Sequence, residues 1–334
     1  MSTGGAVLCG LGTWLPPHAV TNDDLARELD TSDEWIRSRT GIGTRHVVDV
    51  STATSDLAVE AGRRALKSAG RESVDAVLLA TTTPDHPCPA TAPLVAARLG
   101  LGTVAAFDLG AVCTGFLYAL ATGAGLIAAG SAGSVLVIGA DVYSTILDPA
   151  DRSTRAIFGD GAGAVVLRAG EADEPGALGP PVLGSDGTGS ELIIIRAGGS
   201  REPLRTVAEG HGDPYFRMAG KAVFRNAVER MAEASLTAAG RVGWAADDID
   251  RLVAHQANLR ILHAVADRMR LPRHRCPVHL DQVGNTAAAS IPLALSHAVA
   301  TGELEPGHRT VLTAFGGGLT WGACAVRWPA ITQA

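Results

Sequence analysis

Runs of apolar residues alternate along the chain with segments in which small and apolar residues recur at helical spacing. Continuous apolar runs, as opposed to runs alternating with polar residues, are typical of strands buried on both faces. The pattern therefore predicts an α/β fold whose sheets are covered by helices. The expected strands are 75–83, 134–141, 162–169, 250–258, 309–318 and 321–328, and the expected helices are 55–69, 89–99, 113–129, 216–239, 257–269 and 286–301.

The second half of the chain repeats the order of the first at a nearly constant spacing. The run "DAVLLATTT" begins at Asp75 and "DRLVAHQAN" begins at Asp250, 175 residues later. The loop with Cys113 and the loop with Asn285 follow a similar offset, of 172 residues. Chance similarity between apolar strands is the alternative. A duplication would bring corresponding loops together near one axis, so that Cys113, His255 and Asn285 could meet.

Cys113 lies in "AVCTGF", between an apolar run and a long helix of small residues. The unpaired N–H groups of a helix start favour a thiolate, and we expect them to lower the thiol pKa from ~8.5 towards ~7. Free cysteine is also among the most frequently buried residue types, so this side chain can equally be an apolar filler of the core. Position alone leaves both interpretations of Cys113 open.

Two further polar residues and one glycine-rich loop are candidate parts of a site. His255 ends an apolar strand and can also be an ordinary core histidine, and Asn285 can also be an ordinary turn or capping residue. The loop "AFGGGLTWG" (314–322) has spare backbone N–H groups that could bind an oxyanion.

Composition narrows the class of protein. The chain has 334 residues, 46% hydrophobic, with a formal net charge of −6, which argues against a nucleic-acid partner. The N-terminal residues have no basic region typical of a signal peptide, and no apolar run is long enough for a bilayer. We expect a cytoplasmic protein without membrane attachment. The cysteines include no CxxC pair, so the sequence predicts that the protein has no disulfide and no metal site. They are Cys9, Cys88, Cys113, Cys276 and Cys324.

Six motifs in order along the chain resemble the 3-oxoacyl-[acyl-carrier-protein] synthase III (ketosynthase III) family of the thiolase superfamily. The resemblance covers essentially the whole chain and makes Cys113 the expected nucleophile. The motifs are "TSDEWIRSRTGI" (31–42), "AVCTGF" (111–116), "DRSTRAIFGDGAGAVVL" (151–167), "HQANLRI" (255–261), "GNTAAASIP" (284–292) and "AFGGGLTWGA" (314–323).

The resemblance implies a thiolase-like duplicated fold, with two pseudo-symmetric halves in layered α-β-α-β-α architecture. The expected halves are residues 1–170, which carry Cys113, and residues 216–334, which carry His255 and Asn285. Residues 171–215 are expected to form a crossover and loop region. A homodimer is also implied.

The resemblance also implies a reaction. The Cys113 thiolate would take an acyl group from acyl-CoA, with the oxyanion held by the backbone N–H groups of Cys113 and Gly317. His255 and Asn285 would then stabilise the enolate formed as malonyl-acyl carrier protein loses CO₂, and a 3-oxoacyl product would initiate fatty-acid or polyketide synthesis. No metal and no cofactor are expected, because acyl-CoA and the carrier protein are substrates.

The same resemblance assigns substrate contacts. For CoA, Trp35 and Arg152 would sandwich the adenine, Arg39 would lie near the phosphates, and Asn258 would contact the pantetheine arm. Cys88 occupies a position where many members carry phenylalanine, which would leave the acyl pocket room for a branched, longer or unusual group. The basic residues expected to bind the acidic carrier protein are Arg225, Arg260 and Arg268, although Asp267 is a departure from the basic pattern.

Two other functions remain open at this point. An acyltransferase of the same fold could move the acyl group from Cys113 to an oxygen, a nitrogen or a carrier thiol without loss of CO₂. A non-enzymatic scaffold subunit is the third possibility, and Cys113 argues against it, because such subunits lack the reactive cysteine.

Overall fold

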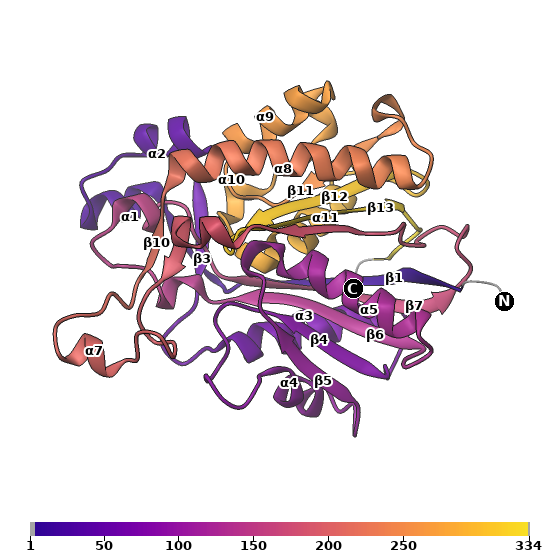
Figure 1. Ribbon diagram of the computed structural model, residues 1–334, viewed down its shortest axis with the longest axis horizontal. Coiled ribbons are helices and arrows are strands. Elements are labelled where there is room, and N and C mark those ends of the chain that lie inside the picture. The colour runs from indigo at the N-terminus through magenta and orange to yellow at the C-terminus, as the bar shows by residue number, and fades with distance from the viewer. Residues whose placement is uncertain (1–3, 333–334) are drawn as a thin grey trace.

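The computed structural model describes residues 4–332, which form two mixed sheets with helices between and outside them (Figure 1). The first sheet has the strand order β1 (Gly5–Trp14), β7 (Gly161–Gly170), β6 (Ser134–Asp141), β4 (Ala76–Ala80) and β5 (Ala105–Leu109). The second has the order β11 (Arg251–Ala254), β12 (Arg309–Gly316), β13 (Thr320–Arg327) and β8 (Val182–Ser185).

The two sheets repeat one topology. In the first, β4 is parallel to β6, and β6 is antiparallel to β7. In the second, β11 is parallel to β12, and β12 is antiparallel to β13. Strand β1 pairs antiparallel with β7, and β8 pairs antiparallel with β13, so these outer strands also occupy corresponding positions. The position of β8 changes the predicted organisation, because this strand lies within residues 171–215 and belongs to the second sheet rather than to a plain crossover.

The helices form three layers around these sheets. Helices α5 (Gly115–Ala128) and α11 (Ser290–Ala300) lie between them, and each contacts strands of both. Helices α3 (Thr54–Ser68) and α4 (Ala92–Arg98) cover the outer face of the first sheet, and α8 (Gly220–Arg241) and α9 (Leu259–Met269) cover the second (Figure 1). The expected α-β-α-β-α layering is confirmed.

The remaining elements surround the ends of the strands. They are β2 (His18–Thr21), α1 (Asn22–Glu28), α2 (Asp33–Thr40), β3 (Thr44–Val47), α6 (Arg152–Arg155), β9 (Ile193–Ile195), α7 (Arg205–Ala208), β10 (Phe216–Met218) and α10 (Leu280–Val283). The expected helix over 216–239 begins later, because residues 216–218 pair with β9. None of the helices described is both long enough and apolar enough to cross a membrane.

Small residues allow the central helices to approach the strands closely. Every residue of β6 is buried, and a Cβ on Gly139 of this strand would lie 2.4 Å from the carbonyl oxygen of Ala288. Apolar side chains of both sheets and both central helices form one shared core that includes Leu78, Leu120 and Leu312. This packing joins the two halves and brings the loops before α5 and α11 together.

The duplication extends to the backbone of these two loops. One-turn helices at Val112–Thr114 and Ala287–Ala289 precede α5 and α11. Each begins at a non-glycine residue with positive φ, 49° at Val112 and 47° at Ala287. The structural counterpart of Cys113 is therefore Ala288 rather than Asn285, which lies three residues earlier in its loop. The predicted correspondence of loops holds, but the residue match is corrected.

Candidate active site

Cys113 lies in the one-turn helix that leads into α5, and its side chain is buried. Burial raises the pKa of the Cys113 thiol, and the Asp141 carboxylate raises it further, whereas the backbone N–H of Cys113 opposes the rise. The lowered pKa expected from the helix start is therefore wrong, because desolvation outweighs the effect of the helix N-terminus. Burial favours the neutral thiol of Cys113.

Cys113, His255 and Asn285 line one small chamber of about 40 Å³, so the predicted convergence of these residues is confirmed. The chamber lies between the strand ends of the two halves. Its other walls are almost entirely apolar and include Phe158, Ile193, Phe216, Met218, Val223, Ala227, Met231, Ala257, Ile261 and Phe315.

His255 follows β11, and its ring is held by Ser290 at the start of α11. The Nδ1 atom lies 2.6 Å from the Ser290 hydroxyl, which also accepts a bond from the backbone N–H of Gln256 at 3.4 Å. The Ser290 hydroxyl can donate to Nδ1 or accept from it, and in either case the contact fixes the orientation of the imidazole ring. Burial lowers the pKa of His255 to about 3, so the ring is neutral at pH 7.

Asn285 has a side-chain amide whose orientation is fixed by its own loop. Its Oδ1 accepts a hydrogen bond from the Ala287 backbone N–H at 2.9 Å. Since one end of the amide is engaged in this turn, the NH₂ end is available to the chamber. The turn role and the proposed donor role of Asn285 are thus compatible.

The glycine-rich loop packs directly against the nucleophile. A Cβ on Gly316 would lie 3.0 Å from the Cys113 backbone nitrogen, and one on Gly317 would lie 3.4 Å from a methyl group of Val112. Only a residue without a side chain allows this approach at Gly316. The arrangement places Gly316 against the Cys113 backbone and Gly317 next to Val112, and the oxyanion role of the Gly317 N–H stays a prediction.

Asp141 joins the two halves directly beneath the site and was not recognised from the sequence. One carboxylate oxygen accepts the backbone N–H of Thr82 at 2.6 Å, and the other accepts that of Ala288 at 3.0 Å. Burial raises the pKa of Asp141 to about 7, although these hydrogen bonds oppose the rise. Its signal in the sequence is the single acidic residue that ends the apolar run 134–141.

A cleft of about 840 Å³ leads from the surface to the chamber, and Asn285 borders both. Four of the predicted substrate residues line it, namely Arg39, Asn258, Arg225 and Arg260. Asn258 also caps α9, because its Oδ1 accepts the Arg260 backbone N–H at 2.9 Å, and its Nδ2 donates to the Arg39 carbonyl at 3.1 Å. Lys221 at the start of α8 is a further cationic wall residue that the sequence reasoning missed.

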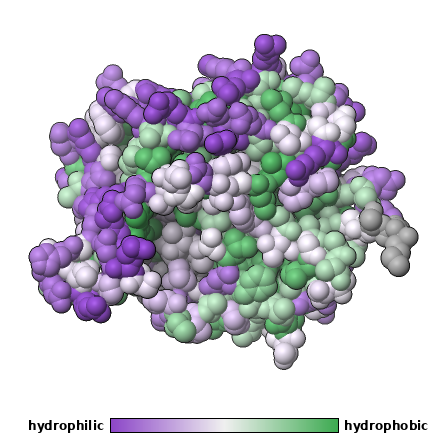
Figure 2. Space-filling model, viewed as in Figure 1, coloured by the Kyte–Doolittle hydropathy of each residue, from purple (hydrophilic) through white to green (hydrophobic). Residues whose placement is uncertain are grey.

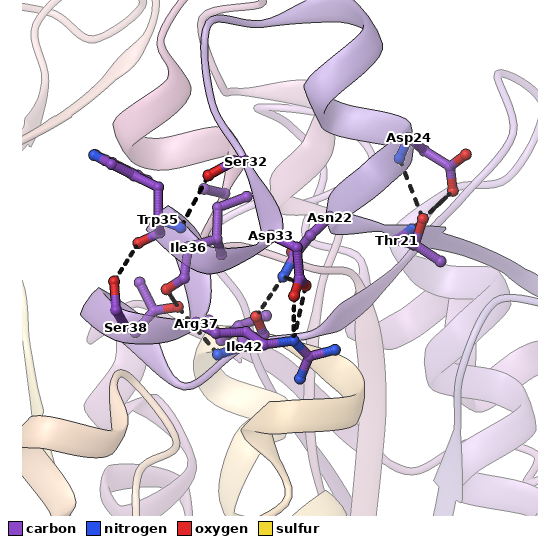
Figure 3. A network of polar contacts seen from close by, with 12 residues as sticks. Thr21, Asn22, Asp24, Ser32, Asp33, Trp35, Ile36, Arg37, Ser38 and Ile42 are labelled. Carbon is purple, nitrogen blue, oxygen red and sulfur yellow. Dashed lines mark hydrogen bonds and ion pairs between the residues drawn. The ribbon is translucent and has the colours of Figure 1, made fainter.

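Trp35 and Arg152 lie together at the edge of this cleft rather than in its walls. The Arg152 guanidinium carbon is 5.0 Å from the Trp35 ring centroid, and that of Arg39 is 4.6 Å away. Figure 3 shows Trp35 projecting away from the polar contacts that fix α2. Its backbone N–H donates to Ser32 at 3.1 Å, and Asp33 anchors the helix to Asn22 at 2.8 Å.

Arg268 and Cys88 also lie outside both the cleft and the chamber. Arg268, on α9, is 3.9 Å from the carboxylates of Glu229 and Glu233, which offset its charge. Cys88 is exposed in the loop between β4 and α4 and does not line the chamber of its own chain. Asp267, which precedes Arg268 in α9, forms an ion pair with Arg273 at 2.6 Å.

The fold and the site define a condensing enzyme of the thiolase type. The family model described as 3-Oxoacyl-[acyl-carrier-protein (ACP)] synthase III matches residues 107–187, and the model of its C-terminal part matches residues 240–328. The chain is 61% identical over 331 residues to beta-ketoacyl-[acyl-carrier-protein] synthase III 3 of Streptomyces coelicolor, covering 98% of this chain and 99% of that protein.

Comparison with solved structures supports the same family. The 3-oxoacyl-(acyl carrier protein) synthase III of Pseudomonas aeruginosa superposes with a TM-score of 0.92 at 55% identity, covering 98% of this chain and 99% of that one. A priming β-ketosynthase from a polyketide pathway gives 0.91 at 34%, covering 99% and 98%. The chain belongs to the 3-oxoacyl-[acyl-carrier-protein] synthase III family, and its reaction is the condensation of an acyl-CoA with malonyl-acyl carrier protein.

Ser290 is a positioning residue for His255. It lies in the motif 284–292, but the sequence alone gave it no role. Ser290→Ala will leave His255 without the partner that holds its ring in place, so we expect CO₂ release from the malonyl substrate to fall ~10-fold or more. Ser290→Thr keeps a hydroxyl and should retain more activity than the alanine variant. Equal rates of CO₂ release in the wild type and Ser290→Ala would contradict this role of Ser290.

Proposed function

We propose that the condensation proceeds through an acyl-Cys113 intermediate and that His255 and Asn285 stabilise the enolate. The observation that carries this proposal is the chamber that Cys113, His255 and Asn285 share. The Cys113 sulfur attacks the thioester carbonyl, the C–S bond to CoA breaks, and the thiol proton leaves on the CoA sulfur. The backbone N–H groups of Cys113 and Gly317 hold the oxyanion.

The second half-reaction uses the neutral side chains of His255 and Asn285. His255 Nε2–H and Asn285 Nδ2–H donate to the malonyl thioester carbonyl as the bond to the carboxylate breaks and CO₂ leaves. The resulting carbanion attacks the acyl carbonyl, the C–S bond to Cys113 breaks, and a 3-oxoacyl chain remains on the carrier. A proton from solvent then restores the Cys113 thiol. Two neutral donors suit this step because the charge develops on the carbonyl oxygen. The steps require neither a metal nor a redox cofactor.

The residues around the cleft suit the two substrates. Arg39 and Asn258 would contact the phosphates and the pantetheine arm of CoA, and Trp35 with Arg152 would hold the adenine. Arg152 must move from its place over the Trp35 ring for a base to enter between them, and its ion pair with Asp30 at 3.0 Å would then break or move with it. Arg225 and Arg260 at the cleft, supported by Arg268, would meet the acidic carrier protein.

The same chemistry admits one competing function, an acyl transfer from Cys113 to another nucleophile. The experiment that separates them supplies acyl-CoA with malonyl-acyl carrier protein and measures CO₂ together with the protein mass. CO₂ release coupled to turnover of acyl-Cys113 supports condensation. Acyl transfer without CO₂ would overturn it, and a chain that is never acylated would overturn both.

A homodimer is the proposed assembly, through the edge strand β5. Within residues 4–332 this strand pairs only with β4. Phe107 on it is 39% exposed, and Leu94 on the neighbouring α4 is 46% exposed. Figure 2 shows less hydrophilic surface over this lower part of the view than over α8 and α9. An unpaired apolar edge is a template for a second copy of the chain. In that dimer, Cys88 would border the partner's acyl pocket.

Phe107→Lys should therefore shift the protein from dimer to monomer in analytical ultracentrifugation, because it places a charge in the proposed interface. Leu183→Lys is the matched control, since Leu183 is similarly exposed, at 40%, on the edge strand β8 of the other sheet. A Phe107→Lys protein that sediments like the wild type would count against β5 as the interface.

A further inference from the structure

The backbone of Asn285 is bonded to a short segment, residues 156–159, that follows α6. The Asn285 N–H donates to the Ile157 carbonyl at 2.9 Å, and the Asn285 carbonyl accepts the Gly159 N–H at 3.0 Å. Phe158 and Asn285 thereby form an isolated parallel bridge. Because both backbone groups of Asn285 are bonded to this segment, the place of its amide in the chamber depends on where residues 156–159 lie.

Arg45, on β3, holds this segment through its guanidinium group. Its Nη2 donates to the Ala156 carbonyl oxygen at 2.8 Å, and its Nη1 donates to the Val20 carbonyl oxygen at 3.2 Å. Val20 lies opposite Arg45 on the neighbouring strand β2. One planar fork thus ties residues 156–159 to the two-stranded sheet of β2 and β3, which a single ammonium group on a flexible stem would do less rigidly.

The stem of Arg45 also packs against both sides of the bridge at Asn285. A Cβ on Gly159 would lie 3.0 Å from the Arg45 Cβ, and a Cβ on Gly284 would lie 3.1 Å from it. Gly159 follows Phe158 in one strand of the bridge, and Gly284 precedes Asn285 in the other. Arg45 therefore contacts both segments that meet at Asn285, in addition to its hydrogen bond to Ala156.

The charge of Arg45 is buried without a formal counter-charge in these bonds. The side chain is 1% exposed, its two hydrogen bonds go to neutral carbonyls, and within residues 4–332 its Nε has no hydrogen-bond partner. Burial lowers the Arg45 pKa to about 10, so the group stays charged at neutral pH. Because a buried charge is costly, an apolar side chain would fill this space at less cost.

We propose that Arg45 is a positioning residue for Asn285, which it serves by fixing residues 156–159 in place. This inference rests on the proposed role of Asn285 as a donor to the enolate. Cys113 and His255 are held by other contacts, Cys113 by the turn before α5 and His255 by Ser290. Loss of the Arg45 bonds should therefore act mainly on the step that needs the Asn285 amide.

The test measures the two half-reactions separately in Arg45→Met. One assay follows CO₂ release from malonyl-acyl carrier protein, and the other follows acylation of Cys113 by intact mass, with whichever of acetyl-, butyryl- or octanoyl-CoA acylates the wild type fastest. We expect CO₂ release to fall ~10-fold, because a small displacement of a donor is costly, while acylation changes much less. Arg45→Lys keeps the charge without the fork and should lie between Arg45→Met and the wild type.

Arg275→Met is the matched control. The Arg275 Nη1 also donates to two backbone carbonyls, those of Asp247 at 3.0 Å and Ile249 at 2.8 Å, and Arg275 lines neither the cleft nor the chamber. This variant loses a comparable pair of bonds and should keep the wild-type ratio of the two rates. Equal losses of both half-reactions in Arg45→Met would show a general structural effect and overturn the positioning role.

A second comparison asks whether Arg45 acts through Asn285. In an Asn285→Ala background, Arg45→Met should lower CO₂ release little further, because the donor that it positions is already gone. The same ~10-fold loss in both backgrounds would overturn the proposal, since independent effects add. If Arg45→Met does not fold, Arg45→Lys in the two backgrounds decides.

Failure of this inference is distinct from failure of the proposed function. Arg45→Met with wild-type CO₂ release, beside an Asn285→Ala protein that has lost it, overturns the positioning role alone. Asn285→Ala with wild-type CO₂ release overturns the proposed donor role of Asn285, and the role of Arg45 with it.

Discussion

Cys113→Ala will lose acylation by acyl-CoA completely and will lower condensation by ~10³-fold or more. The reason is that the sulfur forms and breaks the bond to the acyl group, and an alanine methyl group provides no substitute. The side chain is buried in the chamber with His255 and Asn285, so the change removes one atom of the reaction centre without a change of surface. Intact-mass measurement after incubation with acyl-CoA, together with product formation, checks the prediction.

The variant also separates the two half-reactions. His255 and Asn285 remain in place in Cys113→Ala, so slow loss of CO₂ from malonyl-acyl carrier protein should persist. The matched control is Cys9→Ala, because Cys9 lies on β1, remote from the chamber, with its sulfur 3.5 Å from the Val166 carbonyl oxygen. Retained acylation in Cys113→Ala would mean that another residue is the nucleophile.

Asn285→Asp is the sharpest test of the decarboxylation step, and we expect it to lower CO₂ release by ~10²–10³-fold. The two side chains have the same shape, and the aspartate can still accept the Ala287 backbone N–H that Asn285 accepts at 2.9 Å. What changes is the other end, where the NH₂ donor becomes an oxygen that cannot donate to the developing enolate and repels its charge when ionised.

The acylation of Cys113 should change much less, because that step uses the backbone donors of Cys113 and Gly317. Asn226→Asp is the control for the chemical change itself, since Asn226 lies on α8 with its Nδ2 bonded to the Ala222 carbonyl at 3.0 Å. Asn285→Asp with wild-type CO₂ release would remove Asn285 from the mechanism. An equal loss of both half-reactions would point to a distorted loop instead of a lost donor.

The layers of the fold could be predicted from the sequence, because the buried strands and the central helices correspond to continuous apolar runs. The runs 134–141 and 309–318 became β6 and β12, with the end of the latter shortened by the glycine-rich loop. Strands β1 and β8 were missed, whereas β5 corresponds to the strand-like run before Cys113. Strand β8 alternates between half-buried and exposed positions, so it is not a continuous apolar run.

The site was predictable in part for a similar reason. Cys113, His255 and Asn285 could be joined by the repeat and by the motifs, both of which are properties of the sequence. The roles of Ser290 and Asp141 could not be inferred, because each depends on a hydrogen bond to a residue in a different part of the chain. The direction of the Cys113 pKa shift was also missed, since desolvation is set by the final packing and not by the helix start alone.

The matched positive φ angles at Val112 and Ala287 show that both halves use one backbone bend before their central helices. At matched positions of that bend, one half carries the thiol of Cys113 and the other carries the methyl group of Ala288. The two halves therefore share a symmetric backbone around a site whose side-chain chemistry is asymmetric.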